Sequence, residues 1–195
     1  MLIKMLPADK KALLVELARL LALSDNQLLW DGKTKDELRS DSDLNNLTIQ
    51  KDALETELLE EMEQQSPGFS APGFSAPGFF GGLFSMSAEN KLIEKLKTYP
   101  LSIIDAPETR IQAATAVLKN LLEHQTMENI TTPKVIIFQL FLVALRDGQI
   151  SSIEWMLLKE IQLAFKVPDF IFKDLLDHAE SLNNEMSKLL ALILE

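Results

Sequence analysis

Residues 135–145 read VIIFQLFLVAL, a run in which Gln139 is the single polar residue. A helix formed by this run is apolar on nearly every side, and such a helix has to be enclosed by other elements of the protein. The run is also far too short to cross a bilayer as a helix. We therefore expect a core helix over residues 133–146, surrounded by further helices.

Helical spacing of apolar residues recurs along the rest of the chain. In residues 7–23, for example, Leu13, Leu17 and Leu20 fall on one face of a helix. The other predicted helices cover residues 49–62, 87–96, 107–122, 152–165 and 168 to near the end, with a break around Asn183, and a short helix starts at Thr34. No segment shows the alternation of a strand. The expected fold class is all-α, a bundle of about seven to eight helices.

Charge and composition narrow the function. Acidic residues outnumber basic ones 29 to 19, and the net charge is −10. Because the basic residues form no cluster, a phosphate backbone would be repelled, so no nucleic-acid partner is expected. The absence of cysteine excludes disulfides, thiolate metal sites and a cysteine nucleophile. No glycine-rich phosphate loop, nucleophile elbow or histidine-based triad is present, so we expect a protein without enzymatic activity.

The length and the N-terminus predict one domain in the cytoplasm. A chain of 195 residues with 47% apolar content is expected to form a single domain over residues 1–195. The apolar run near the N-terminus is interrupted by Glu16 and Arg19 and lacks the cleavage site of a secretory signal. A mature amphipathic helix in a cytoplasmic protein is the default expectation.

Residues 66–84 read SPGFSAPGFSAPGFFGGLF, a near-repeat without a charged residue. Each Pro-Gly pair fits the centre of a type II turn, so the repeat precludes a helix. We expect residues 64–88 to be a linker or an insert within the helical domain. Its rings either fold back on the bundle or contact a protein partner or the surface of a membrane, and the absence of basic residues makes the first alternative slightly preferable. The predicted partner-binding residues are Phe69, Phe74, Phe79, Phe80 and Phe84.

Two predicted helices end alike, in ALSDN at residues 22–26 and in ALRDG at residues 144–148. Asn26 and Gly148 belong to the residue types that most readily take the left-handed conformation at a helix end. A capping box follows each end, as Thr34 to Glu37 and as Ser151 to Glu154. This internal repeat predicts a bundle built from two related halves.

The repeated ends also carry acidic residues. If the halves pack around a pseudo-two-fold axis, their carboxylates converge and supply the oxygen ligands that a hard divalent cation needs. The predicted ligands of such a site are Asp25, Asp31, Asp147 and Glu154. The alternative is that these residues are ordinary caps and turn residues, which need no metal.

A second acidic segment, residues 41–52, has some of the spacing of an EF-hand loop. Asp41, Asp43 and Asn45 occupy its first ligand positions, and Asp52 occupies the twelfth. Asn46 stands where the loop requires glycine, and Asp52 is shorter than the usual glutamate. An ordinary Asx-turn loop is the favoured interpretation.

The sequence ALRDGQISSIE at residues 144–154, followed by LLKEIQLAFKV, resembles the acidic-glycine motif of the TerB-like tellurite-resistance family. The resemblance is best over residues 109–177 and weaker over residues 13–60. It implies an all-α bundle of two related halves whose paired acidic turns hold a divalent cation, here calcium, magnesium or zinc. Asp147 and Glu154 match the motif well.

The same resemblance implies a non-enzymatic part in the response to tellurite or metal stress, alongside partner proteins at the inner face of the membrane. The alternative function is that of an interaction or scaffold domain that binds a protein, or lies close to a membrane, without a metal.

Overall fold

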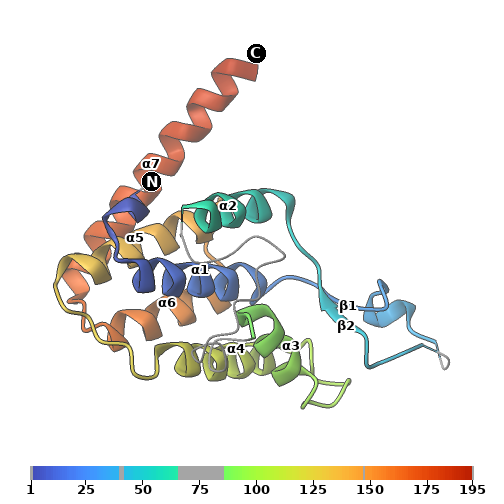
Figure 1. Cartoon of the computed structure of the whole chain (residues 1–195). Coiled ribbons are helices and arrows are strands. Elements are labelled where there is room, and N and C mark those ends of the chain that lie inside the picture. Colours follow the sequence, from blue (N-terminus) through green and yellow to red (C-terminus); the bar gives the residue numbers. More distant parts are fainter. Residues whose placement is uncertain (1, 40–41, 66–85, 147, 195) are drawn as a thin grey trace.

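The structure is a computed structural model, and it describes residues 2–39, 42–65, 86–146 and 148–194. The described residues form a bundle of α-helices with one small sheet (Figure 1). The helices are α1 (Ala8–Leu23), α2 (Ala53–Gln64), α3 (Ala88–Leu96), α4 (Pro107–Leu122), α5 (Thr131–Ala144), α6 (Ser152–Ala164) and α7 (Asp169–Leu194), with the short 3-10 helices η1 (Leu2–Met5) and η2 (Lys35–Glu37). The all-α prediction is confirmed.

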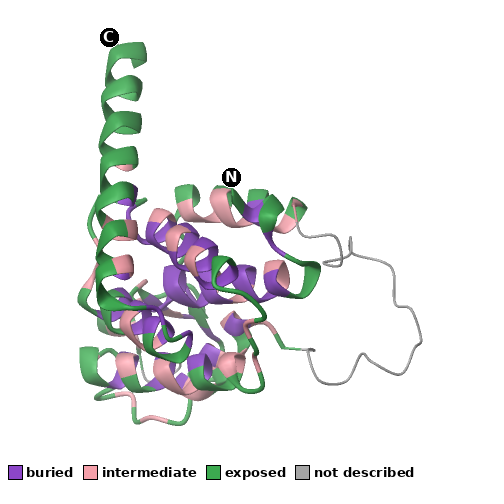
Figure 2. Cartoon of the chain, turned by 90° about the vertical axis from the view of Figure 1, so that its left-hand side faces the viewer, coloured by how far each residue is buried: buried purple, intermediate pink, exposed green. Residues whose placement is uncertain are grey.

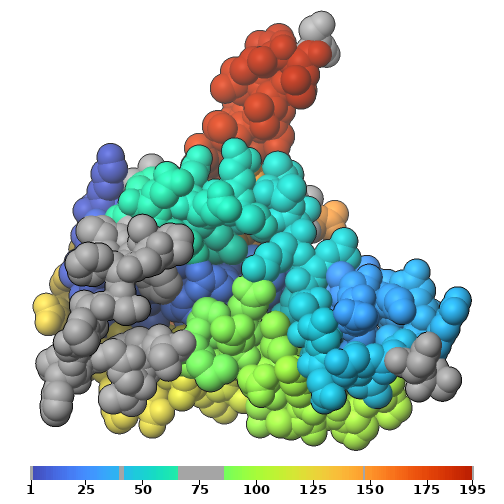
Figure 3. Space-filling view, turned by 45° about the vertical axis from the view of Figure 1, so that its right-hand side comes forward, coloured from blue at the N-terminus to red at the C-terminus, as the bar shows by residue number. Residues whose placement is uncertain are grey.

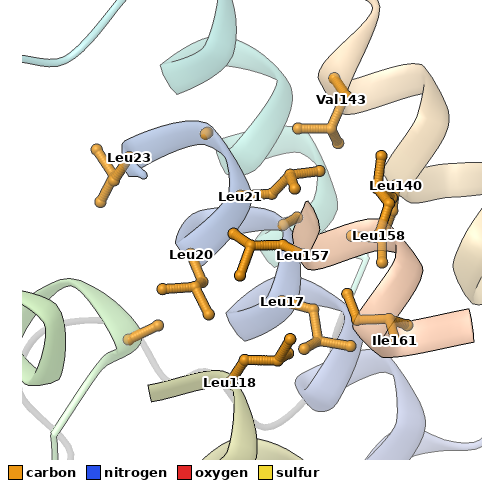
Figure 4. Close-up of a cluster of buried hydrophobic side chains, with 14 of the residues drawn as sticks. Leu17, Leu20, Leu21, Leu23, Leu118, Leu140, Val143, Leu157, Leu158 and Ile161 are labelled. Atoms are coloured by element: carbon orange, nitrogen blue, oxygen red, sulfur yellow. The ribbon is translucent and has the colours of Figure 1, made fainter. Parts of the chain in front are cut away.

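The core lies around α1 and α5, which pack against each other. α5 also contacts η1, α6 and α7, while α1 contacts α2, α3, α4 and α6. In Figure 4, Leu21 of α1 points toward Leu140 and Val143 of α5, and Leu17 of α1 lies beside Ile161 of α6. The apolar helix α5 is therefore enclosed as predicted, because its neighbours bury it on most of its circumference.

Most helices start and end within about two residues of the predicted bounds. Ser87 caps α3 by accepting a hydrogen bond from the backbone N–H of Asn90, at 3.3 Å, and Pro107 is the first residue of α4. The start of α2 was predicted too early: Asp52 caps that helix and accepts from the backbone N–H groups of Leu54 and Glu55. Leu54, in the first turn of this helix, is half exposed.

The expectation that the chain contains no strand was wrong. Two three-residue strands, β1 (Leu28–Trp30) and β2 (Leu47–Ile49), pair antiparallel, with Leu28 opposite Ile49 and Trp30 opposite Leu47. All four of these side chains are buried, while the residues between them are not. Each strand is too short for the alternation of apolar and polar residues to be visible in the sequence.

The last helix, α7, is unbroken and runs for 26 residues, about 39 Å. The expected break around Asn183 is absent, because that residue continues the helix and binds the end of α5. The first half of α7 lies against the bundle, and the second half projects from it (Figures 1 and 2). Within the described residues, none of the helices combines the length and the apolar character needed to cross a membrane.

The ends of the segment predicted as an insert are attached to α1. Arg19 of α1 forms ion pairs with Glu16 and with Glu63 near the end of α2, and Glu16 accepts a hydrogen bond from the backbone N–H of Ala88 at 2.5 Å. The five phenylalanines of the segment lie outside the described residues, so their contact with a partner remains a prediction.

Candidate functional site

The turn after α1 is capped by a side chain from another helix. Arg110, in the first turn of α4, is 5% exposed. Its guanidinium donates to the backbone carbonyls of Leu23, Ser24 and Asn26 at distances of 2.7–3.1 Å. Leu23 is the last residue of α1, Ser24 is its C-cap and Asn26 lies in the turn beyond, where the helix itself offers these carbonyls no N–H partner. The guanidinium also lies at the negative end of the helix dipole.

The electrostatics of this turn follow from the buried guanidinium. Burial lowers the pKa of Arg110, and the carboxylates of Asp105 and Asp25 oppose that change. Asp25 itself is exposed, and a positive charge is already present beside it. A divalent cation at Asp25 would therefore lie close to a fixed cation.

The turn after α5 is capped in a similar way but has a different backbone. Gly148 has a φ of +98°, in the left-handed region that the sequence predicted for it. Asn183 of α7 donates its side-chain amide to the carbonyl of Leu145 at 3.0 Å. Asn26 lacks the positive φ that was predicted for it, because Arg110 binds the carbonyls that a left-handed turn would otherwise satisfy.

Glu154 is buried in the capping box of α6. One of its carboxylate oxygens accepts from the backbone N–H of Ser151 at 2.8 Å, and the Ser151 hydroxyl accepts from the backbone N–H of Glu154 at 3.3 Å. A second box is present at η2, where Glu37 accepts from the backbone N–H and from the hydroxyl of Thr34. Those two hydrogen bonds lower the pKa of Glu37. The capping boxes are thus present as the sequence predicted.

Asp31 lies in the tight turn that follows β1. Its φ is +53°, and Gly32 follows with +77°. The Asp31 carboxylate accepts from the side-chain amide of Asn46 at 3.1 Å, and its backbone N–H donates to the Asn46 carbonyl at 3.0 Å. In the other acidic segment, Asp43 accepts from the backbone N–H of Asn45, which is the Asx turn that was favoured there.

The structure does not bring the described members of the predicted metal site together. Asp147 lies outside the described residues. Among residues 2–39, 42–65, 86–146 and 148–194, no three aspartate, glutamate or histidine side chains gather in an arrangement that could hold a metal ion. Asp25 lies near Arg110, Asp31 accepts from Asn46, and Glu154 belongs to the capping box of α6. A cation site around Asp147 therefore remains a prediction from the motif.

The metal prediction has a direct test. A cation that binds only the native state raises the melting temperature by mass action. The motif predicts such a rise with millimolar calcium, magnesium or zinc. The rise should be lost in the variant Asp147→Asn. The variant Asp31→Asn, in the turn after β1, should keep the rise if Asp147 is the main ligand. Equal melting of the wild-type protein with each ion and with chelator would show that the acidic turns are caps alone.

A cleft of about 360 Å³ opens between α1, α2 and the start of α3. Figure 3 shows the surface of α1 between those of α2 and α3. Polar contacts cross this region: Lys51 pairs with Glu89 at 2.8 Å, and the Asn26 amide donates to Glu55 at 3.0 Å. Its charged side chains thus tie neighbouring elements together, as surface ion pairs commonly do with a small gain in stability.

The projecting half of α7 was not singled out by the sequence as a site. We define residues 182–194 as the α7 arm. Its apolar side chains are exposed, from 45% for Leu182 to 85% for Leu194. They are Leu182, Met186, Leu189, Leu190, Leu192, Ile193 and Leu194. The helical spacing of leucines continues beyond residue 182. Because the bundle needs no further helix there, this spacing could have indicated an exposed apolar surface.

Comparisons of the chain with protein-family models, with curated proteins and with solved structures found no match. The similarity to the TerB-like family therefore rests on the motif at residues 144–154 and remains a prediction. The all-α fold stands independently of it.

Proposed function

We propose that this chain is a non-enzymatic, helical protein-interaction module whose contact surface is the α7 arm. The observation that carries the proposal is the exposure of the arm. In Figure 2 the arm is exposed along nearly its whole length, whereas the part of α7 beside the bundle includes buried residues. A contiguous exposed apolar surface on a soluble domain commonly marks an interaction site.

The first half of α7 is packed against the bundle, and the arm continues the same helix away from it. Phe172 and Ala179 are buried, and Phe172 packs edge-on against Phe141 of α5, with ring centroids 4.9 Å apart. Asn183 then binds the carbonyl of Leu145. Beyond this point the side-chain interactions described for the arm are internal, as in the ion pair of Lys188 with Glu185 at 2.7 Å. A partner would therefore bind a helix that is already formed, so the arm would lose little conformational entropy on binding.

The charge of the arm favours a protein over a membrane as its partner. Residues 182–194 contain one acidic residue, Glu185, and one basic residue, Lys188. Amphipathic helices that bind anionic lipid carry several basic residues on the polar face, and each contributes to attraction. A helix that carries no net charge and exposes apolar side chains fits instead into a groove or against another helix.

Site-specific photo-crosslinking in cells tests this function. We expect a photo-reactive residue at Leu190, an exposed apolar residue of the arm, to crosslink to protein. The matched control is Asn184, a polar residue that is exposed on the same arm. Crosslinks that form equally from both positions, or that join Leu190 to lipid alone, would contradict the proposal.

A further inference from the structure

The apolar stripe of α7 follows a heptad pattern across the boundary between its two halves. Starting at Phe172, apolar residues recur at alternating intervals of three and four positions. The members of this series are Phe172, Leu175, Ala179, Leu182, Met186, Leu189 and Ile193. An alternation of three and four is the pattern by which helices pack in coiled coils.

The structure already shows what the first half of this stripe does. Phe172 and Ala179 are buried, Leu175 is partly buried, and the helix packs along α5. After Asn183 the same stripe continues without α5, because α5 ends at Ala144 and its carbonyl at Leu145 is capped. The arm thus continues the same seam, which is the apolar stripe of α7 whose first half packs against α5.

We infer that the helix that covers this seam belongs to a second copy of this chain, and that the two arms pair antiparallel. The inference rests on the proposed function, because it names the partner of the α7 arm. Pairing of identical arms buries the same stripe on both copies, as in the two-fold interfaces of most homodimers.

The charges of the arm permit this pairing although each chain carries a net charge of −10. Glu185 and Lys188 pair within the arm, so the arm residues 182–194 contribute no net charge. Two arms can therefore meet without the repulsion that other faces of two such acidic chains would experience.

The position of the bundle selects the antiparallel arrangement. In Figures 1 and 3 the bundle lies at one end of the arm and is much wider than it. Packed helices lie only about 8–10 Å apart, so parallel arms would force two bundles into the same space. Antiparallel arms place the two bundles at opposite ends of the paired helices.

Antiparallel pairing also defines which residues meet. A register centred between Ser187 and Lys188 places Met186 of one copy against Leu189 of the other, and Leu182 against Ile193. Because the arm holds only about two heptads, the interface is small, and we expect a reversible dimer with a dissociation constant in the micromolar range.

The experiment measures the molar mass of the purified full chain over a series of concentrations, by light scattering or analytical ultracentrifugation. We expect the mass to rise from 21.9 kDa toward twice that value as the concentration increases. Met186→Lys and Leu189→Glu should each weaken the dimer at least about tenfold, because each places a charge opposite an apolar side chain. Asn184→Glu, outside the stripe, should leave the dimer unchanged.

The double variant M186K/L189E decides the orientation. In the antiparallel dimer each new lysine faces a new glutamate of the other copy, so dimerisation should recover relative to the single variants. In a parallel dimer the lysines face each other and so do the glutamates, and the variant stays monomeric. Circular dichroism checks that all variants keep the helical fold.

The outcomes separate this inference from the proposed function. A wild-type mass of 21.9 kDa up to about 1 mM would overturn self-association. Crosslinks from Leu190 to a different protein would then still support an interaction module. A double variant as weak as the single ones would overturn the antiparallel pairing. Loss of dimerisation in the Asn184→Glu control would show that another surface joins the copies.

Discussion

Replacing Phe141 with alanine is expected to lower the free energy of unfolding by about 3–5 kcal/mol. The Phe141 side chain is 0% exposed in the last turn of α5, and it packs edge-on against Phe172 of α7. The substitution removes the burial of a full ring and leaves a cavity that the surrounding helices cannot fill. Chemical denaturation followed by circular dichroism measures the change.

The matched control is Phe170→Ala, which removes the same ring from a position that is 67% exposed. We expect this variant to lose less than about 1 kcal/mol. If the two variants lose similar amounts, the packing of α5 against α7 is not what holds the core at this point. A double-mutant cycle between Phe141 and Phe172 should return a coupling of about 0.5–1.5 kcal/mol for the aromatic pair.

Most helices could be predicted because local signals mark their ends or their buried faces. In α4, Pro107 marks the first residue and the period of the apolar residues defines the buried face. In α6, the box of Ser151 and Glu154 fixes the start of the helix. Such signals act over a few residues, so they can be read in the sequence alone.

The strands could not be predicted, because their pairing is a long-range property. Three residues of β1 pair with three of β2 across a loop, and neither segment is long enough to show a strand pattern alone. The turn that starts this loop carries Asp31 at a positive φ, next to Gly32. The sequence identified Asp31 by its carboxylate, but its local role depends on Asn46, which is distant in the chain.

The two helix ends that look alike in sequence are completed by unlike side chains. Arg110 caps the end of α1, and Asn183 caps the end of α5. Both capping residues lie on later helices, so the resemblance between residues 22–26 and 144–148 did not reveal them. The burial of Arg110 could have been predicted from the sequence, because this basic residue lies in the same helical stripe as Ala114 and Leu118.

Arg110 is expected to stabilise the fold through its hydrogen bonds to the end of α1. Arg110→Met keeps much of the side-chain volume but removes every donor to the carbonyls of Leu23, Ser24 and Asn26. Leaving a buried acceptor without its partner costs about 1–3 kcal/mol, and more than one carbonyl is affected. We expect a loss of about 2–4 kcal/mol in the free energy of unfolding. The loss is partly offset because the substitution also removes the cost of burying a charge.

Lys119→Met is the control for this prediction, because Lys119 is an exposed cation on the same helix. Its substitution should change the free energy of unfolding by less than about 0.5 kcal/mol. Arg110→Lys should fall between the two, since an ammonium keeps the charge but cannot reach several carbonyls as the planar guanidinium does. If Arg110→Met is instead as stable as Lys119→Met, water replaces the guanidinium at the end of α1.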